Sequence, residues 1–193
     1  MKTKIFLIAL LAITSITFAQ TNWELDKSHS KIGFTVTHMV IAEVEGQFND
    51  YDVKVTSKGD DFEGATVEFT ADVNSIDTDN ERRDNHLKSD DFFNAEKFPQ
   101  MTFVSKSFEK VDGKNYKLVG DLTIRDVTKE VVLNVVHNGT IVDPWGNTKA
   151  GFKATGVINR FDYNLKWNTA LETGGLVVGE DVDITINLEL NKK

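Results

Sequence analysis

Histidines, hydroxyl groups and carboxylates are the side chains that catalysis or metal binding would use in this sequence. The four histidines lie at positions 29, 38, 86 and 137, and no HExxH or other metal-ligand spacing joins them. Ser28, His29 and Ser30 are contiguous, so on a strand the serines and the histidine point to opposite faces, which argues against a hydrolase triad. Gly174-Gly175 lacks the lysine of a P-loop, and the carboxylates are scattered. The sequence therefore predicts no catalytic residue, no metal site and no cofactor.

Arg83 and His86 are candidates for contacting a ligand, because they lie three residues apart in one short polar segment. An arginine suits a phosphate group, since its planar fork donates two hydrogen bonds. In this interpretation the segment is a lid whose cations meet an anionic or quinone head group. In the alternative, the same face is solvated and Leu87 and Phe92 plug one end of the fold. The sequence leaves both interpretations open.

Arg160 and His38 each end an apolar alternation. Arg160 continues the face begun by Phe152, and a charge there is costly unless it is paired. It therefore lies at a rim, pairs with Asp162 or binds a ligand. His38 is interpreted either as a core histidine hydrogen-bonded to a neighbour or as a group near a ligand head.

These residues need a scaffold, and a period of two in hydrophobicity shows which one. Apolar and polar residues alternate in run after run, which is typical of antiparallel strands with one apolar and one wet face. Strands are expected over residues 30–38, 43–57, 65–73, 100–110, 116–124, 130–138, 149–161 and 182–190. A capping box at Thr78 and Glu81 predicts a short helix over residues 81–89.

About eight long alternating strands, one short helix and no cysteine predict an all-β fold, an extended eight-stranded antiparallel barrel. Such a barrel leaves room for side chains or for one small ligand. Ten apolar side chains are expected on the inner face, as ligand contacts or as ordinary core: Phe34, Val36, Phe48, Phe69, Phe103, Leu118, Leu122, Phe152, Ile184 and Ile186.

The N-terminus predicts export. Lys2 and Lys4 precede an apolar run from Ile5, and small residues near Ala19 suit a signal peptidase. We therefore expect residues 1–19 to be a cleaved signal peptide and residues 20–193 to form one domain in the periplasm or outside the cell. The net charge of −8 becomes −10 without the two lysines of that segment, which excludes binding to nucleic acid by charge.

Several motifs together resemble the YceI-like family. The resemblance covers residues 22–190 and rests on the order and spacing of the motifs. They are Trp23-Glu24-Leu25-Asp26, Ser28-His29-Ser30, Arg83-Asp84-Asn85-His86-Leu87, Phe98-Pro99-Gln100-Met101-Thr102-Phe103, Gly120-Asp121-Leu122-Thr123-Ile124, Ile158-Asn159-Arg160 and Val178-Gly179-Glu180. Two positions depart from the family, where glycine is common: Asp126, in a turn before Val127 where positive φ is expected, and Asn164.

The resemblance implies a lipocalin-like barrel that holds a long-chain isoprenoid lipid, a polyprenyl phosphate or an isoprenoid quinone, in its lumen for storage or transport. It implies a binding protein rather than an enzyme, and a protein that is not integral to a membrane. Whether the chain forms a homodimer stays open. Three alternatives remain. One is an enzyme of isoprenoid or quinone metabolism that uses the same pocket, and another is an outer-membrane barrel. The third is a surface-binding module that acts through Trp145 and Trp167.

Overall fold

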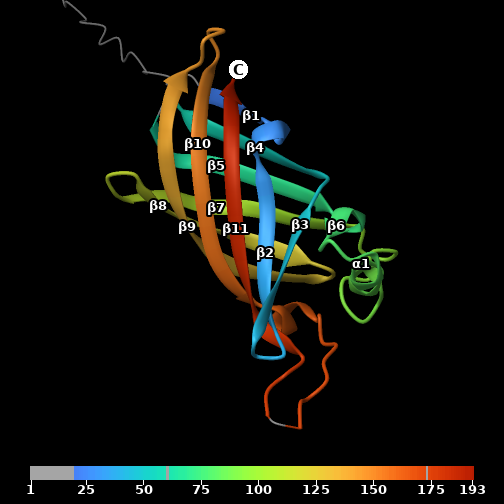
Figure 1. Ribbon diagram of the computed structural model, residues 1–193. Helices are drawn as coiled ribbons and strands as arrows, with labels where there is room; N and C mark the ends of the chain where they lie inside the picture. Colours follow the sequence, from blue (N-terminus) through green and yellow to red (C-terminus); the bar gives the residue numbers. More distant parts are fainter. Residues whose placement is uncertain (1–19, 60, 173) are drawn as a thin grey trace, which may run out of the picture.

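The computed structural model describes residues 20–59, 61–172 and 174–193 (Figure 1). The expected signal peptide, residues 1–19, lies outside the described residues. The elements in chain order are β1 (Gln20–Leu25), η1 (Lys27–His29), β2 (Lys31–His38), β3 (Ala42–Phe48), β4 (Tyr51–Lys58), β5 (Asp61–Asp72), η2 (Val73–Ser75), β6 (Ile76–Asp77), α1 (Glu81–Lys88), β7 (Gln100–Asp112), β8 (Asn115–Ile124), β9 (Val127–Val142), β10 (Thr148–Asn159), η3 (Arg160–Tyr163) and β11 (Val178–Lys192).

Eight of these strands close into an antiparallel barrel. The ring runs β1-β4-β5-β7-β8-β9-β10-β11, and β11 pairs with β1 to close it. The strands are long, with 16 residues in β9 and 15 in β11. α1 is the single α-helix in the described part of the chain. The predicted fold class, an all-β eight-stranded barrel with one short helix, is confirmed.

Strand β11 is long, and along one of its edges it has two partners in succession. Its first part pairs with β2, from Val178 opposite His38 onward, and its last part pairs with β1, where Leu190 lies opposite Leu25. The turn η1 separates the two partners. β2, β3 and β6 then continue the sheet beside the lower half of β11, as Figure 1 shows.

The expectation of a single strand over residues 43–57 is wrong, because the structure divides this range into β3 and β4. The break falls at Asn49 and Asp50, where the chain turns a corner between two partner sets. β3 pairs with β2 and β6, whereas β4 pairs with β1 and β5. The hydrophobic alternation shifts by one residue at the corner, from even positions such as Val44 and Phe48 to odd positions such as Tyr51 and Val53, and this shift marks the break in the sequence.

The helix α1 is confirmed, but its predicted cap is wrong. Asn80 is the N-cap, and its side-chain oxygen accepts a hydrogen bond of 3.0 Å from the backbone N–H of Arg83. Thr78 instead donates its hydroxyl and its backbone N–H to the buried carboxylate of Asp84. The loop before the helix is thereby tied to the first turn of the helix.

The barrel end near β1 is closed by a cluster of rings. Phe62, fully buried, packs against Trp23, His137 and Phe152, with ring centroids 4.7 to 5.1 Å apart. Trp23 donates its indole N–H to Ser57 at 2.9 Å, so the polar atom of this plug is satisfied. We call this end the β1 end.

The opposite end, here the α1 end, is held by Arg125. Its guanidinium donates to the carbonyls of Asp90, Phe92 and Asn164 at 2.8 to 3.3 Å, which ties the β8–β9 turn to the segment after α1 and to η3. Arg125 itself has positive φ (55°), so the expectation that Asp126 takes this conformation is wrong. Asn164 does adopt left-handed backbone, φ 63°, as the C-cap of η3.

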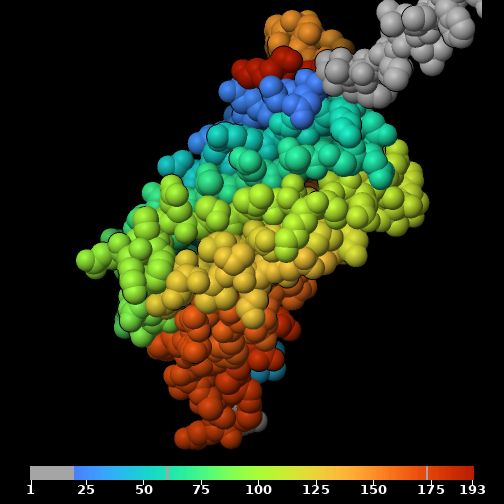
Figure 2. Space-filling view, turned by 180° about the vertical axis from the view of Figure 1, so that it is seen from behind, coloured from blue at the N-terminus to red at the C-terminus, as the bar shows by residue number. Residues whose placement is uncertain are grey.

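One part of the barrel wall has no backbone–backbone hydrogen bonds between its two neighbouring strands. β5 and β7 pair only from Glu68–Asp72 to Gln100–Val104. Beyond that register, residues 63–66 and 105–109 line a polar groove on the face seen in Figure 2. Side chains replace the missing ladder, since Ser105 accepts from the backbone N–H of Val67 at 2.8 Å and Glu63 from that of Lys110 at 3.0 Å.

Candidate functional site

The barrel encloses a cavity of about 200 Å³ whose wall is almost wholly apolar. Within the described chain, Arg160 is the one charged residue that lines it. All ten apolar side chains expected on the inner face lie at this wall: Phe34, Val36, Phe48, Phe69, Phe103, Leu118, Leu122, Phe152, Ile184 and Ile186. The strand alternation therefore predicts the inner face, while the role of these residues in binding stays a prediction.

Several lining residues escape the sequence pattern. Leu87, Phe92 and Phe93 reach the cavity from α1 and the segment after it, where no strand period applies. Phe62 lines it from β5 although its parity is opposite to that of Phe69 on the same strand. The pairing of β4 with β5 shifts register near residues 61–66, and Gly64 takes positive φ (69°), so the strand changes parity there.

The inner face is buried at the β1 end and more exposed towards one side of the α1 end. Phe62 and Leu190 are 0% and 1% exposed. Along the paired strands β2 and β11, the lining residues Val36, Val178 and Val182 are only partly buried. The cavity is thus sealed at the β1 end, and one less covered part of its wall lies where β2 meets the start of β11.

Arg160 is buried, 4% exposed, and its hydrogen bonds go to main-chain carbonyls. Nε donates to Gly179 at 2.7 Å, Nη1 donates to Leu165 and to Trp167, and Nη2 donates to Val178 at 3.0 Å. Burial lowers the pKa of the guanidinium, and the charge of Glu180 partly opposes this effect. Arg160 is thus buried, and the expected alternative of pairing with Asp162 is wrong; whether it binds a ligand stays a prediction.

The four carbonyls use four of the five N–H groups of Arg160. The fifth, on Nη2, has no hydrogen-bond partner among the described residues. Arg160 therefore lines an otherwise apolar cavity with a positive charge, and one of its N–H groups has no partner among the described residues. A polar ligand atom beside this N–H would find a group able to hold it.

Arg83 and His86 do not line the cavity. Arg83 donates to the carbonyl and the hydroxyl of Thr78 at 2.6 and 2.8 Å. His86 contacts Asp91 at 2.9 Å and packs edge-on against the rings of Phe92 and Trp167, both at 5.1 Å. The arrangement agrees with the alternative interpretation, in which the helix closes one barrel end.

His38 ends β2 and is partly buried, but it lies outside the cavity wall. Its backbone pairs with Val178 and Ala42. No hydrogen bond to its imidazole occurs within residues 20–59, 61–172 and 174–193. The expected hydrogen-bonded neighbour is absent from the described residues, and a role for His38 near a ligand head stays a prediction.

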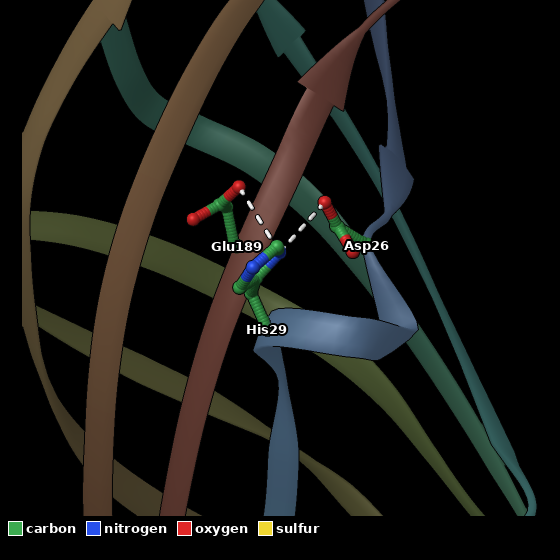
Figure 3. A group of neighbouring side chains, drawn as sticks. All are labelled: Asp26, His29 and Glu189. Atoms are coloured by element: carbon green, nitrogen blue, oxygen red, sulfur yellow. Dashed lines mark hydrogen bonds and ion pairs between the residues drawn. The ribbon is translucent and has the colours of Figure 1, made fainter.

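Asp26, His29 and Glu189 form a cluster on the outer surface, drawn in Figure 3. The His29 Nδ1 atom lies 3.2 Å from Asp26 and 3.8 Å from Glu189. Lys149 contacts both carboxylates, at 3.0 and 2.6 Å, and so supplies the cation that they need. Hydrogen bonds from Ser28 and Lys149 hold the pKa of the Asp26 carboxyl well below its usual range. The cluster is an ion-pair network that pins η1 to β11.

In the described residues, no helix combines the length and the apolar character needed to cross a bilayer.

Comparison with known proteins agrees with this architecture. The model of the YceI-like domain matches residues 23–190. A UPF0312 protein of Staphylococcus aureus strain MSSA476 is 41% identical over 174 residues, which cover 89% of this chain and 98% of the relative. The solved Campylobacter jejuni YceI protein is 34% identical with a TM-score of 0.68, over 88% of this chain and 96% of that one. A polyisoprenoid binding domain from Saccharophagus degradans, implicated in plant cell wall breakdown, shares the fold. It is 15% identical with a TM-score of 0.62, and the match covers 89% of this chain and 98% of that domain. The chain belongs to the YceI-like family.

Proposed function

We propose that this protein binds a long-chain isoprenoid lipid, a polyprenyl phosphate or an isoprenoid quinone, and stores or carries it without changing it chemically. The observation that carries the proposal is the cavity wall, which is apolar throughout except for Arg160. The polyisoprenoid binding named for the Saccharophagus degradans domain supports the same class of ligand. The expected export signal supports action in the periplasm or outside the cell.

The driving force is the removal of the prenyl chain from water. Each buried CH₂ contributes about 0.8 kcal/mol, so a five-carbon unit contributes about 4 kcal/mol before the cost of ordering the chain. The β1 end is closed by the rings around Phe62, so the chain tail points towards this plug. The head group then lies at the α1 end, where Arg160 offers its remaining N–H to an oxygen of the ligand.

An enzyme that uses the same cavity is the second candidate. Proton transfer needs a titratable side chain within hydrogen-bond reach of the reacting atom. The lining residues of the described chain offer only the guanidinium of Arg160, whose donors are mostly engaged. This observation favours carriage over catalysis.

The test is native mass spectrometry of the protein purified from its own compartment without detergent, followed by lipid extraction. We expect one prenyl lipid per chain. Ala154→Trp places a large ring at the cavity wall and should abolish the extra mass, whereas Val157→Trp, on an exposed position of the same strand, should retain it. A protein that takes up neither polyprenyl phosphate nor quinone in solution would refute the proposal.

A further inference from the structure

The tip of the β2–β3 hairpin displays three consecutive apolar side chains. Met39, Val40 and Ile41, here called the apolar tip, are 43%, 63% and 89% exposed. Met39 and Val40 take left-handed backbone, with φ of 51° and 66°. This conformation is uncommon for any residue except glycine and unfavourable for a β-branched one. The turn thus retains bulky apolar residues where glycine would be easier to accommodate.

The apolar tip adjoins a less covered part of the cavity wall. His38, the residue before the tip, pairs with Val178, and Val36 pairs with Val182. Val36, Val178 and Val182 all line the cavity and are only partly buried. In Figure 1 the hairpin lies at the lower end of the barrel, beside the segment that leads into β11, and that segment reaches further down. A surface that met the tip would therefore lie next to this side of the cavity.

Charge and size indicate what kind of surface fits the tip. Exposed acidic residues flank it, Glu43 and Glu45 on β3 and Glu180 and Asp181 on β11. Such a collar is repelled by anionic lipid, so contact has to come from apolar insertion rather than from charge. A protein–protein interface takes about 20 to 30 residues a side, far more than a three-residue turn offers. An exposed apolar turn flanked by acidic residues fits a bilayer of neutral lipids.

We propose that the apolar tip inserts into the interface of a bilayer with zwitterionic head groups, and so brings this less covered part of the cavity wall to the membrane. Its role in loading a lipid rests on the proposed function, but the contact with the bilayer is separate from it. Neither Val40 nor Ile41 lines the cavity. The two ideas therefore fail in different experiments.

The first experiment uses the absence of cysteine from the chain. Ile41→Cys and, as the matched control, Ile141→Cys are labelled with an environment-sensitive fluorophore. Ile141 is 65% exposed in the β9–β10 hairpin, at the β1 end. On titration with phosphatidylcholine vesicles we expect a blue shift and at least a twofold rise in emission at position 41, with no change at position 141. No change at position 41, or equal changes at both, would overturn the proposal.

The second experiment removes the apolar side chains. Val40→Ser/Ile41→Ser should reduce flotation with phosphatidylcholine vesicles at least fivefold, whereas Ile141→Ser/Val142→Ser should leave it unchanged. Stronger binding of the unaltered protein to phosphatidylglycerol vesicles would contradict the proposal. So would a tip variant that turns a dimer into a monomer without affecting flotation, since the tip would then join two chains. If the protein floats but takes up no prenyl lipid from solution, the carrier function fails and the membrane contact stands.

Discussion

Arg160→Met tests whether the buried guanidinium organises the α1 end of the barrel. The side chain donates four hydrogen bonds to main-chain carbonyls of residues 165, 167, 178 and 179. These carbonyls belong to the segment between η3 and β11 and to the start of β11. Methionine fills a similar volume but donates nothing, so the variant leaves the four acceptors without their donor.

The expected loss follows from these bonds. A hydrogen bond to a charged group contributes about 1.5 to 3 kcal/mol, so four contribute roughly 6 kcal/mol at the lower limit. Removing the charge also removes its desolvation cost, which is several kcal/mol and offsets about half of that gain. We therefore expect the free energy of unfolding to fall by about 3 kcal/mol, a large share of the 5–15 kcal/mol that is usual for one domain.

The assay is urea unfolding at pH 7, followed by tryptophan fluorescence. With a slope of about 2 kcal/mol per molar, the midpoint should fall by about 1.5 M. Arg82→Met, which changes an exposed arginine of α1, is the control and should leave the midpoint unchanged. A loss below about 1 kcal/mol for Arg160→Met would refute the reasoning, because the carbonyls would then be satisfied equally well by water.

Two further predictions concern the β1 end and the cavity wall. Burial lowers the pKa of His137, so below about pH 6.5 the unfolded chain binds a proton more readily than the folded chain does. The free energy of unfolding should therefore fall as the pH drops below about 6.5. His137→Phe should remove this dependence, which is measured by comparing urea midpoints at pH 7.5 and 5.5. An unchanged pH dependence in His137→Phe would assign it to other groups. Gly46→Ala would bring a methyl group within 2.3 Å of the Phe34 ring, so it should cost about 1–3 kcal/mol, whereas Gly151→Ala, with its nearest neighbour at 3.6 Å, should cost little. Equal thermal midpoints for the two alanine variants would show that the Phe34 ring moves aside freely.

Much of the barrel follows from residue order alone. An alternation such as Ile184 and Ile186 against Asp183 and Thr185 places apolar side chains on one face of a strand, because successive side chains of a strand point to opposite sides. All ten residues selected in this way lie at the cavity wall. Helix α1 was also predictable, since its polar residues and capping signals are local.

Other features depend on which strand lies beside which. The corner at Asn49 and Asp50 arises because β3 and β4 have different partners, and the hydrophobic alternation shifts by one residue there. Phe62 turns inward because the register with β4 slips, which changes the parity of β5. Each event shifts the hydrophobic alternation by one residue, which marks a break but not the new partner, so the expected single strand was wrong and Phe62 was not selected.

The sequence by itself determined the class of this protein: alternation dictates strands with one apolar face, and an all-β chain buries those faces by closing on itself. The tertiary structure alone decided the surroundings of the polar groups. Arg160 meets four carbonyls from segments up to 19 residues away in the chain, and Arg83 and His86 are turned from the cavity by Thr78 and Asp91. The physical reason is range, because side-chain direction repeats every two residues along a strand, whereas hydrogen-bond partners are set by distant segments that folding brings together.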